Sequence, residues 1–334
     1  MTQKYLIPLA AVFLLFLVAY TGAGAGLGWF FGIVFPYLAI IAFLVGFVIK
    51  VMGWARAAVP FRIPTTCGQQ KSLPWIKQNR IDNPDTASGV FVRMLLEIFL
   101  FRSLFRNTKA AFSRNASNRI TYSWEIFLWV AALAFHYAFL VVLLRHFRFF
   151  TSPVPFSVQF LEALDGIVQL GLPGLFLSGV VLPAAVLFLL ARRLFDQKVR
   201  YISQASDYFP LFLILGIAIT GISLRYFTKV DILAVKEMSM GLVTFSPTIP
   251  DGIGNLFYAH LFLVSVLFAY FPASKLMHLG GVFLSPTRNM ANNTRAQRHV
   301  NPWNYDVPIH TYEQYEDHFR DKMIEAGLPV EKKE

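Results

Sequence analysis

The sequence is poor in charged residues and contains a single cysteine. Only 15% of its 334 residues are charged and 56% are hydrophobic, whereas soluble domains carry about 25% charged residues. This deficit excludes an ordinary soluble protein. The single cysteine, Cys67, excludes an intrachain disulfide framework, a Cys-rich zinc site, a self-contained iron–sulfur cluster and a CxxCH attachment motif. A haem linked covalently to the chain is therefore excluded.

Long apolar runs take the place of charge. A membrane-spanning helix needs about 20 mostly apolar residues. Six stretches approach or meet this length: 5–20, 28–52, 124–147, 169–191, 207–226 and 254–277. The second stretch is interrupted only by Gly and Pro, which membrane helices tolerate. The sequence therefore predicts an all-α integral membrane protein with six transmembrane helices.

The segments between these runs alternate in charge. Residues 53–123 contain eleven Lys and Arg against three acids, and 192–205 and 279–300 are also basic, whereas 21–27, 148–167 and 227–253 are not. Basic segments stay on the cytoplasmic side. We therefore expect a multi-pass protein of the cell inner (cytoplasmic) membrane with both termini in the cytoplasm. The net charge of +11 then reflects topology and contact with membrane lipid, and indicates no nucleic-acid partner.

Two stretches allow a second interpretation. Residues 87–107 are apolar but carry Arg93, Glu97, Arg102 and Arg106. Central charges are costly in lipid, so this stretch predicts a helix lying in the membrane interface. The first run, followed by the small residues at 21–26, could be a signal peptide. We expect a span there, because the next apolar run follows at once.

Four of the seven histidines lie in or at the ends of two predicted spans. His136 and His146 are ten residues apart, about 15 Å along a helix, and His260 and His278 are eighteen apart, about 27 Å. Spans three and six run antiparallel. His136 therefore faces His278 toward the cytoplasm, and His146 faces His260 toward the outside. Helix tilt can absorb the mismatch in length.

Two facing histidines are the axial ligands of an electron-transferring haem. Neutral imidazole binds haem iron well, and two imidazoles saturate it. A single histidine in a membrane helix is often a hydrogen-bond partner of another helix, but four that separate into two facing pairs favour two b-type haems. The other three histidines, His299, His310 and His318, lie in the polar tail and are expected to be solvated.

Charged residues near the outer pair are candidates for further contacts. We expect Arg145 and Arg225 to pair with haem propionates, and Asp165 and Lys229 to bind quinone. On the cytoplasmic side, Gly280–Asn304 combines Arg, amides and an aromatic residue, which is typical of an interface, and the loop Pro64–Trp75 has a similar character. They predict a docking surface with Arg288, Arg295, Arg298, Asn289, Asn292, Asn293, Asn301 and Trp303. A single cysteine cannot hold a cluster, so Cys67 is expected to be a free thiol.

At these residues the sequence resembles a known family. The histidine pairs ten and eighteen apart are similar to those of the gamma subunit of respiratory nitrate reductase, with one extra N-terminal helix. The motifs PFRIPTTCGQQKSLPWIK at 60–77 and FLSPTRNMANNTRAQRHVNPWN at 283–304 resemble the DsrM family. These are the membrane cytochromes b of the Dsr complex of dissimilatory sulfur metabolism. The resemblance covers nearly the whole chain.

The resemblance implies two haems b, a menaquinone site and a cytoplasmic iron–sulfur partner similar to the catalytic subunit of heterodisulfide reductase. It also implies other Dsr subunits and, indirectly, the small sulfur-carrier protein DsrC. The chain would then divide into two N-terminal transmembrane helices (1–52), a cytoplasmic basic loop with an interfacial helix (53–123), a four-helix haem-binding part (124–278) and a cytoplasmic tail (279–334). It would act as the electron-transfer subunit of a quinone-linked oxidoreductase.

Three alternatives stay open at this point. Within the same class, the chain could serve a nitrate-reductase-like or heterodisulfide-reductase-like complex with another partner. A transporter would show ionisable residues in broken helices and an inverted repeat, which the sequence lacks apart from the histidines. A haem-free membrane anchor would differ from a cytochrome in its absorption spectrum.

Overall fold

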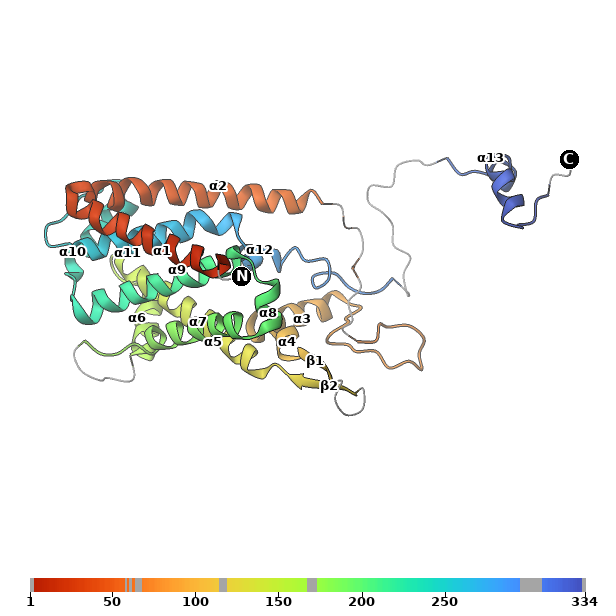
Figure 1. The fold of residues 1–334 in the computed structure, drawn as a ribbon, viewed down its shortest axis with the longest axis horizontal. Helices are drawn as coiled ribbons and strands as arrows, with labels where there is room; N and C mark the ends of the chain where they lie inside the picture. The colour runs from red at the N-terminus through yellow and green to blue at the C-terminus, as the bar shows by residue number, and fades with distance from the viewer. Residues whose placement is uncertain are drawn as a thin grey trace.

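The computed structural model describes residues 3–57, 59, 62–63, 68–113, 119–166, 173–294 and 308–331. Its main feature is a bundle of long helices lying side by side (Figure 1). Among the described residues, six helices are long and apolar enough to cross a membrane: Gln3–Leu27, Phe30–Ala55, Ile126–Phe149, Leu177–Phe195, Ala205–Phe227 and Asn255–Ala273. The predicted all-α membrane fold with six spans is confirmed, and the chain is a multi-pass membrane protein.

Each span consists of an α-helix, in most cases extended by a short π or 3-10 segment. They are α1 (Gln3–Gly22) with η1 (Ala23–Leu27), η2 (Phe30–Val34) with α2 (Phe35–Ala55), α5 (Ile126–His146) with η3 (Phe147–Phe149), α7 (Leu177–Phe195), α9 (Ala205–Ile222) with η4 (Ser223–Phe227), and α11 (Asn255–Tyr270) with η5 (Phe271–Ala273). Large apolar side chains such as Phe13, Ile41 and Leu44 are exposed on their outer faces. Such a surface suits hydrocarbon rather than water.

The two ends of the bundle differ. We call one the α3 end, after α3 (Ala87–Leu100), and the other the α10 end, after α10 (Ile232–Val243). Helix α6 (Phe156–Asp165) lies at the same end of the bundle as α10, at the left of Figure 1, whereas α8 (Gln197–Ile202) and the end of α2 lie toward α3. The short helix α13 (Tyr312–Glu325) follows near the C-terminus.

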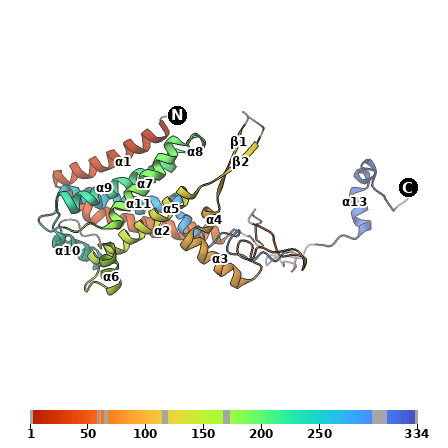
Figure 2. The same cartoon turned by 90° about the horizontal axis from the view of Figure 1, so that it is seen from below.

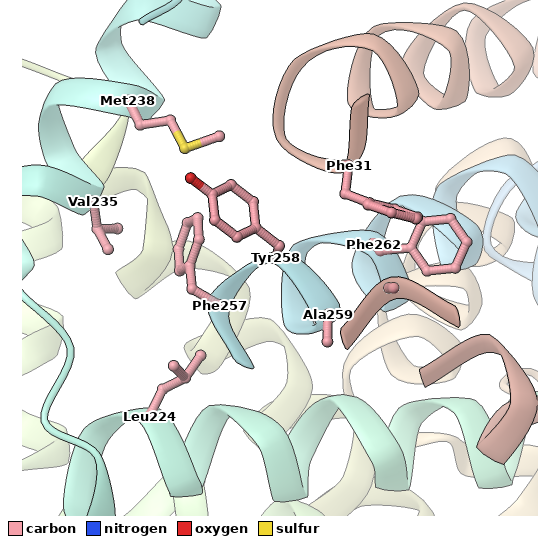
Figure 3. Packing of buried hydrophobic residues seen from close by; sticks show 9 residues of the cluster. Phe31, Leu224, Val235, Met238, Phe257, Tyr258, Ala259 and Phe262 are labelled. Carbon is pink, nitrogen blue, oxygen red and sulfur yellow. The ribbon is translucent and has the colours of Figure 1, made fainter. Parts of the chain in front are cut away.

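An aromatic core closes the α10 end. Phe31, Met238, Tyr258 and Phe262 are buried together where η2, α10 and α11 meet (Figure 3). Gly32 allows this close approach, because a Cβ there would lie 2.5 Å from Cε of Met238 and 2.9 Å from Cε1 of Tyr258. The first two spans are thereby fixed to the helix that carries His260.

The α3 end contains a small β-hairpin that was not predicted from the sequence. After α3 and α4 (Arg102–Phe105), β1 (Thr108–Ser113) pairs with β2 (Arg119–Trp124) in antiparallel register, Thr108 opposite Trp124. The hairpin and α3 point away from each other in Figure 2. Lys109 Nζ lies 2.5 Å from Asp196 Oδ2 and connects the hairpin to the α7–α8 connection. The Lys109 ammonium holds the pKa of Asp196 below its usual value.

The predicted helix within 87–107 forms as α3, with two different sides. Phe91 and Phe99 are exposed, whereas Arg93 is buried and Glu97 faces an ion-pair partner. Thr86 caps the N-terminus by accepting from the Gly89 amide. This amphipathic character fits an interfacial helix, and the interfacial position stays a prediction.

Several predicted span boundaries are wrong, and the first span continues through η1 to Leu27 instead of ending at 20. The fourth span begins at Leu177 instead of 169, because Pro173 and the extended Phe176 precede it. The sixth was expected to continue to 277, but α11 ends at Tyr270. Pro272 lies in the 3-10 turn η5, and Ser274 is fully extended, with φ −111° and ψ 174°. The chain then resumes as η6 (Lys275–Met277) and α12 (His278–Gly281).

Candidate functional site

Two of the predicted histidines face each other at the α3 end. His136 lies in the middle of α5 and His278 begins α12. Their ring centroids are 5.8 Å apart, and the ring planes are inclined by 81°. The ring of Phe101, which follows α3, lies 4.8 Å from the His136 ring in an edge-to-face contact. The structure thus brings together the two residues that the sequence paired; we call them the α3-end pair.

The break after α11 makes this meeting possible. A straight helix would separate His260 from His278 by about 27 Å, far more than the spacing of the histidines on α5. The turn at Phe271–Ser274 shortens that path and redirects the chain. Lys275 then anchors the segment, because its Nζ lies 2.6 Å from Oδ1 of the buried Asp207 in the first turn of α9. The position of His278 therefore depends on an ion pair as well as on a helix.

The other two histidines lie nearer the α10 end. His146 is the last residue of α5, and His260 lies in the second turn of α11. Gly221 of α9 lies against the His260 ring, where a Cβ would be 3.2 Å from Cε1. We call His146 and His260 the α10-end pair.

All four rings hold Nδ1 in a hydrogen bond, with distances of 2.6–2.8 Å. Three of the partners are main-chain carbonyls, which can only accept, so the proton must lie on Nδ1. The lone pair of Nε2 then remains free to bind a metal. The contacts are His136 with Ala132 O, His146 with Val142 O, His278 with Lys275 O, and His260 with Thr220 Oγ1.

A pair of arginines stacks beside the α10-end pair. The guanidinium carbons of Arg145 and Arg225 lie 3.6 Å and 4.0 Å from the centre of the Phe176 ring. Arg145 Nη1 is 2.9 Å from Asp165 Oδ2. Arg225 donates to the carbonyl of Gly174 at 3.1 Å. Within the described residues, Arg225 has no carboxylate within 4.0 Å, and its buried Nε has no hydrogen-bond partner. Two half-buried arginines here share one anion.

Asp165 is bound within the protein. Its carboxylate accepts from the Ser178 amide at 2.7 Å and from the Ser178 hydroxyl at 2.6 Å, in addition to the Arg145 ion pair. These contacts fix the first turn of α7. Lys229, which we predicted to bind quinone together with Asp165, lies at a different place in the structure. Its backbone has a positive φ of 49°.

Lys229 lines a cavity of about 450 Å³ at the α10 end. Leu224 and Leu256, which also line it, are three residues from Gly221 and four from His260, about one helical turn away. The lining residues are Tyr20, Leu224, Thr228, Lys229, Val230, Asp231, Gly252, Gly254, Asn255 and Leu256. The cavity combines apolar walls with an ammonium, a carboxylate, an amide, a hydroxyl and a phenol, and Asp165 is not part of it.

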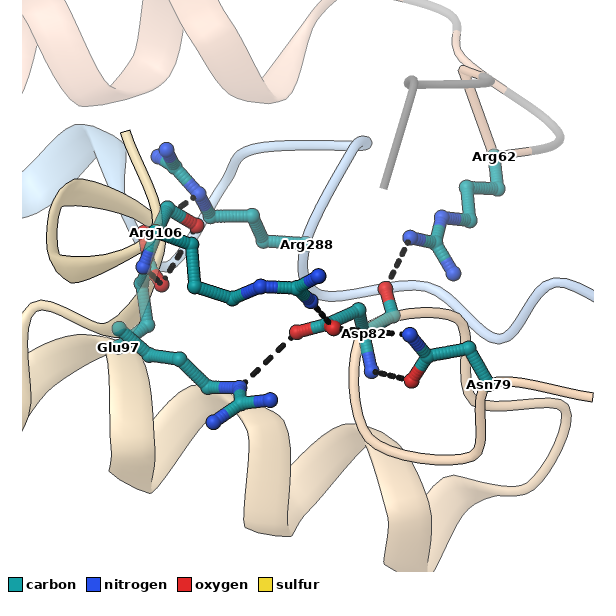
Figure 4. Close-up of polar contacts among 8 residues, drawn as sticks. Arg62, Asn79, Asp82, Glu97, Arg106 and Arg288 are labelled. Atoms are coloured by element: carbon teal, nitrogen blue, oxygen red, sulfur yellow. Dashed lines mark hydrogen bonds and ion pairs between the residues drawn. The ribbon is translucent and has the colours of Figure 1, made fainter. Parts of the chain in front are cut away.

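The two segments predicted to form a docking surface meet at the α3 end, where Gln70 Nε2 donates to Thr294 Oγ1 at 3.1 Å. The second segment also contacts α3 and the loop before it (Figure 4). Arg288 Nε lies 3.1 Å from Glu97 Oε1, and the Asn292 side chain donates to the Asn83 side chain at 2.7 Å. Asn289 donates to the Phe283 carbonyl. Arg295, Arg298, Asn301, Trp303 and Cys67 lie outside the described residues.

Asp82 is the centre of this polar cluster. It accepts from Arg102 Nε at 2.9 Å and also pairs with Arg106. Its main-chain carbonyl accepts from Arg62 at 3.4 Å. Nearby, the Lys71 ammonium, 2.8 Å from Asp85, holds the pKa of that carboxyl below its usual value. Three basic residues of this loop, Lys71, Arg102 and Arg106, are therefore used in ion pairs with its own acids.

The chain is similar to proteins of known family. Residues 89–298, which include all four paired histidines, match the family described as nitrate reductase gamma subunit. A relative from Archaeoglobus fulgidus, named Hdr-like menaquinol oxidoreductase cytochrome b-like subunit, is 46% identical over 291 residues, covering 85% of this chain and 86% of the relative. A protein of the same name from Archaeoglobus profundus is 43% identical over 283 residues, covering 82% and 83%. The chain belongs to the nitrate reductase gamma subunit family.

Proposed function

We propose that the chain is the membrane cytochrome b of a quinone-linked oxidoreductase complex. It would hold two haems b and pass electrons between menaquinone or menaquinol and a cytoplasmic iron–sulfur subunit. The observation that carries this proposal is the α3-end pair, whose rings face each other at 5.8 Å with Nε2 free. The name of the two archaeal relatives, a menaquinol oxidoreductase cytochrome b-like subunit, supports the quinone part.

The donor set fits haem b. A histidine nitrogen binds a first-row metal at about 2 Å, so an iron held between two Nε2 atoms would place the ring centres about 6 Å apart. Among the described residues, no three His, Cys, Asp or Glu side chains gather at one point. Two imidazoles without a third protein ligand suit the axial positions of a haem. When bound, each haem supplies a one-electron iron couple that lacks an open position for oxygen.

The chain's own residues orient the two sites. His136 and His146 lie on the same helix, ten residues and about 15 Å apart. The main-chain bonds to Nδ1 fix both rings with Nε2 away from the helix backbone. In the proposed topology, the α3-end pair lies toward the cytoplasm and the α10-end pair toward the outside. Electrons would then cross the bundle between a quinone and a cytoplasmic partner.

We assign the haem propionate contact mainly to Arg225. Arg145 is paired with Asp165, whereas Arg225 is half-buried beside the same Phe176 ring, has a buried Nε without a partner and lacks an acid within the described residues. A partly buried cation is stabilised by an anion, and a propionate of the haem held by His146 and His260 would provide one. Asp165 is then a residue that positions Arg145 and Ser178 rather than a quinone ligand.

Arg225→Gln should lower the reduction potential of one haem, because the removed cation favours the electron-carrying form. We expect about a tenfold shift of the equilibrium, or about 59 mV. Arg225→Lys keeps the charge and should stay near the original potential. Arg148→Gln, which removes a half-exposed arginine paired with Glu162, is the matched control. Potentiometric titration measures all three, and an unchanged potential in Arg225→Gln would assign the guanidinium to another anion.

We place the quinone in the Lys229 cavity. It lies about one turn from His260, and Lys229, Asn255 and Tyr20 offer hydrogen-bond donors for quinone carbonyls. Ligand pockets usually combine apolar walls with a few polar groups in this way. The cavity belongs to the α10 end, so quinone would exchange electrons first with the haem of the α10-end pair.

The partner would bind at the α3 end. The chain leaves the α3-end pair directly into the segment that packs on Asn83 and Glu97, so a protein seated there would lie next to the haem of His136 and His278. Because Arg288 is engaged by Glu97, its contribution is to shape this surface. Within the family, we favour the DsrM group and dissimilatory sulfur metabolism on the motifs at 60–77 and 283–304. A nitrate-reductase-like or other heterodisulfide-reductase-like complex is the alternative.

The purified protein should contain two haems b per chain, and a menaquinol analogue should reduce them. The first measurement is a pyridine haemochrome assay against protein concentration, and the second is the reduced-minus-oxidised spectrum after quinol addition. Adding an oxidised heterodisulfide-reductase-like partner should reoxidise both haems. A spectrum without haem would leave a membrane anchor as the function, and haems that quinol does not reduce would exclude the quinone link.

A further inference from the structure

His260 differs from the other three histidines in how its ring is held. His136, His146 and His278 each use a main-chain carbonyl three or four residues earlier in the sequence. His260 on α11 uses a side chain of another helix, Thr220 on α9, with 2.8 Å between Nδ1 and Oγ1. Its ring orientation therefore depends on how two spans pack.

The Thr220 hydroxyl is set up to accept this hydrogen bond. Thr220 is buried, and its Oγ1 lies 2.8 Å from the Gly216 carbonyl and 3.0 Å from the Ile217 carbonyl. The one hydroxyl proton must go to these carbonyls, which cannot donate. The oxygen is left to accept from His260 Nδ1–H, and its own donation strengthens it as an acceptor.

The neighbouring residue completes the arrangement. Gly221 lies under the His260 ring, where any Cβ would come within 3.2 Å of Cε1. One turn of α9 therefore provides both the space for the imidazole and the acceptor for its proton.

We propose that Thr220 is a positioning residue that orients His260 and lowers the reduction potential of the haem in the α10-end pair. An acceptor on Nδ1–H increases the electron density at Nε2, which stabilises ferric over ferrous iron. This inference rests on the proposed haem ligation. The quinone would then meet a haem whose potential is set by a contact between helices, whereas the contacts of the α3-end pair are local in the sequence.

The experiment is a redox titration of the purified, haem-loaded full chain. Thr220→Val keeps the shape and removes the acceptor. Loss of a hydrogen bond that supports a metal ligand typically changes metal affinity or activity by about tenfold or more. The reduction potential of one haem should therefore rise by about 59 mV, while that of the other haem stays unchanged. Thr220→Ser should restore the original value. Ser239→Ala, which removes a buried hydroxyl that bonds only its own helix, is the matched control.

The outcomes separate the two claims. Loss of the same single haem in Thr220→Val, with both haems kept in Thr220→Ser, would also support a positioning role, and Thr220→Ala should then behave like Thr220→Val. Unchanged potentials in both the Val and Ala variants, equal shifts of both haems, or failure of Ser to restore the value would overturn the inference. An original protein without two haems would instead overturn the proposed function.

Discussion

Replacing His136 by Ala should remove one haem and leave the purified protein with about half of its b-type absorbance. His278→Ala should give the same spectrum, because the two rings face each other at 5.8 Å and one imidazole cannot hold a bis-histidine haem. His146→Ala and His260→Ala should share a second spectrum that lacks the other haem. Each variant should retain the remaining haem, since each pair lies at a different level of the bundle.

Matched spectra are the decisive comparison in this series. His310→Ala provides the control, because His310 lies beside His318 near α13 and outside the bundle, and it should keep both haems. Potentiometric titration then assigns one potential to each pair. If His136→Ala resembled His260→Ala rather than His278→Ala, the ligand pairs would have to be exchanged.

Lys229→Ala should slow quinol-driven haem reduction by about tenfold. A charge-assisted hydrogen bond is worth roughly 1.5–3 kcal/mol, and 1.4 kcal/mol is about a factor of ten. The absorbance of the dithionite-reduced protein should not change, because Lys229 lines the cavity and touches no histidine of either pair. Stopped-flow mixing with a menaquinol analogue measures the rate.

Two further variants give this test its contrast. Lys236→Ala removes a lysine of α10 that is not among the cavity residues. The haems of this variant should be reduced by quinol at the original rate. In Asp165→Asn, quinol should also reduce the haems at close to the original rate, because Asp165 binds Arg145 and Ser178 and is not a cavity residue. If haem reduction were slow in Asp165→Asn and fast in Lys229→Ala, the quinone site would have to be assigned to the α7 side instead of the cavity.

The six spans could be predicted from the sequence because uncharged apolar runs of this length are typical of helices that cross a membrane. The pairing of the histidines was predicted from the antiparallel direction of the third and sixth spans. The contact between the rings of His136 and His278 agrees with that prediction. The error was to treat residues 254–277 as one straight helix. Pro272 was the available signal, since proline removes a main-chain donor, but tolerance of proline in membrane helices hid it.

Other features had weaker signals or none. Polar–apolar alternation in Arg119–Trp124 could have indicated the second strand of the hairpin. Thr220 could not have been found, because its contact with His260 spans 40 residues and two helices. The same holds for the Arg145–Asp165 ion pair, which depends on the path of the chain between α6 and α7. Long-range side-chain contacts follow from packing, not from local pattern.

The break between α11 and α12 makes the two ligand-bearing segments unequal in their tolerance of insertions. Each added residue turns a continuous helix by about 100°, so one residue inserted between His136 and His146 on α5 would direct one ring away from its partner. The non-helical turn at Phe271–Ser274 has no such register to keep. A residue gained there would change the length of a turn, and Lys275 could still bring His278 back to Asp207. The ten-residue spacing of His136 and His146 is thus a strict constraint on the sequence, whereas the eighteen-residue spacing of His260 and His278 can vary.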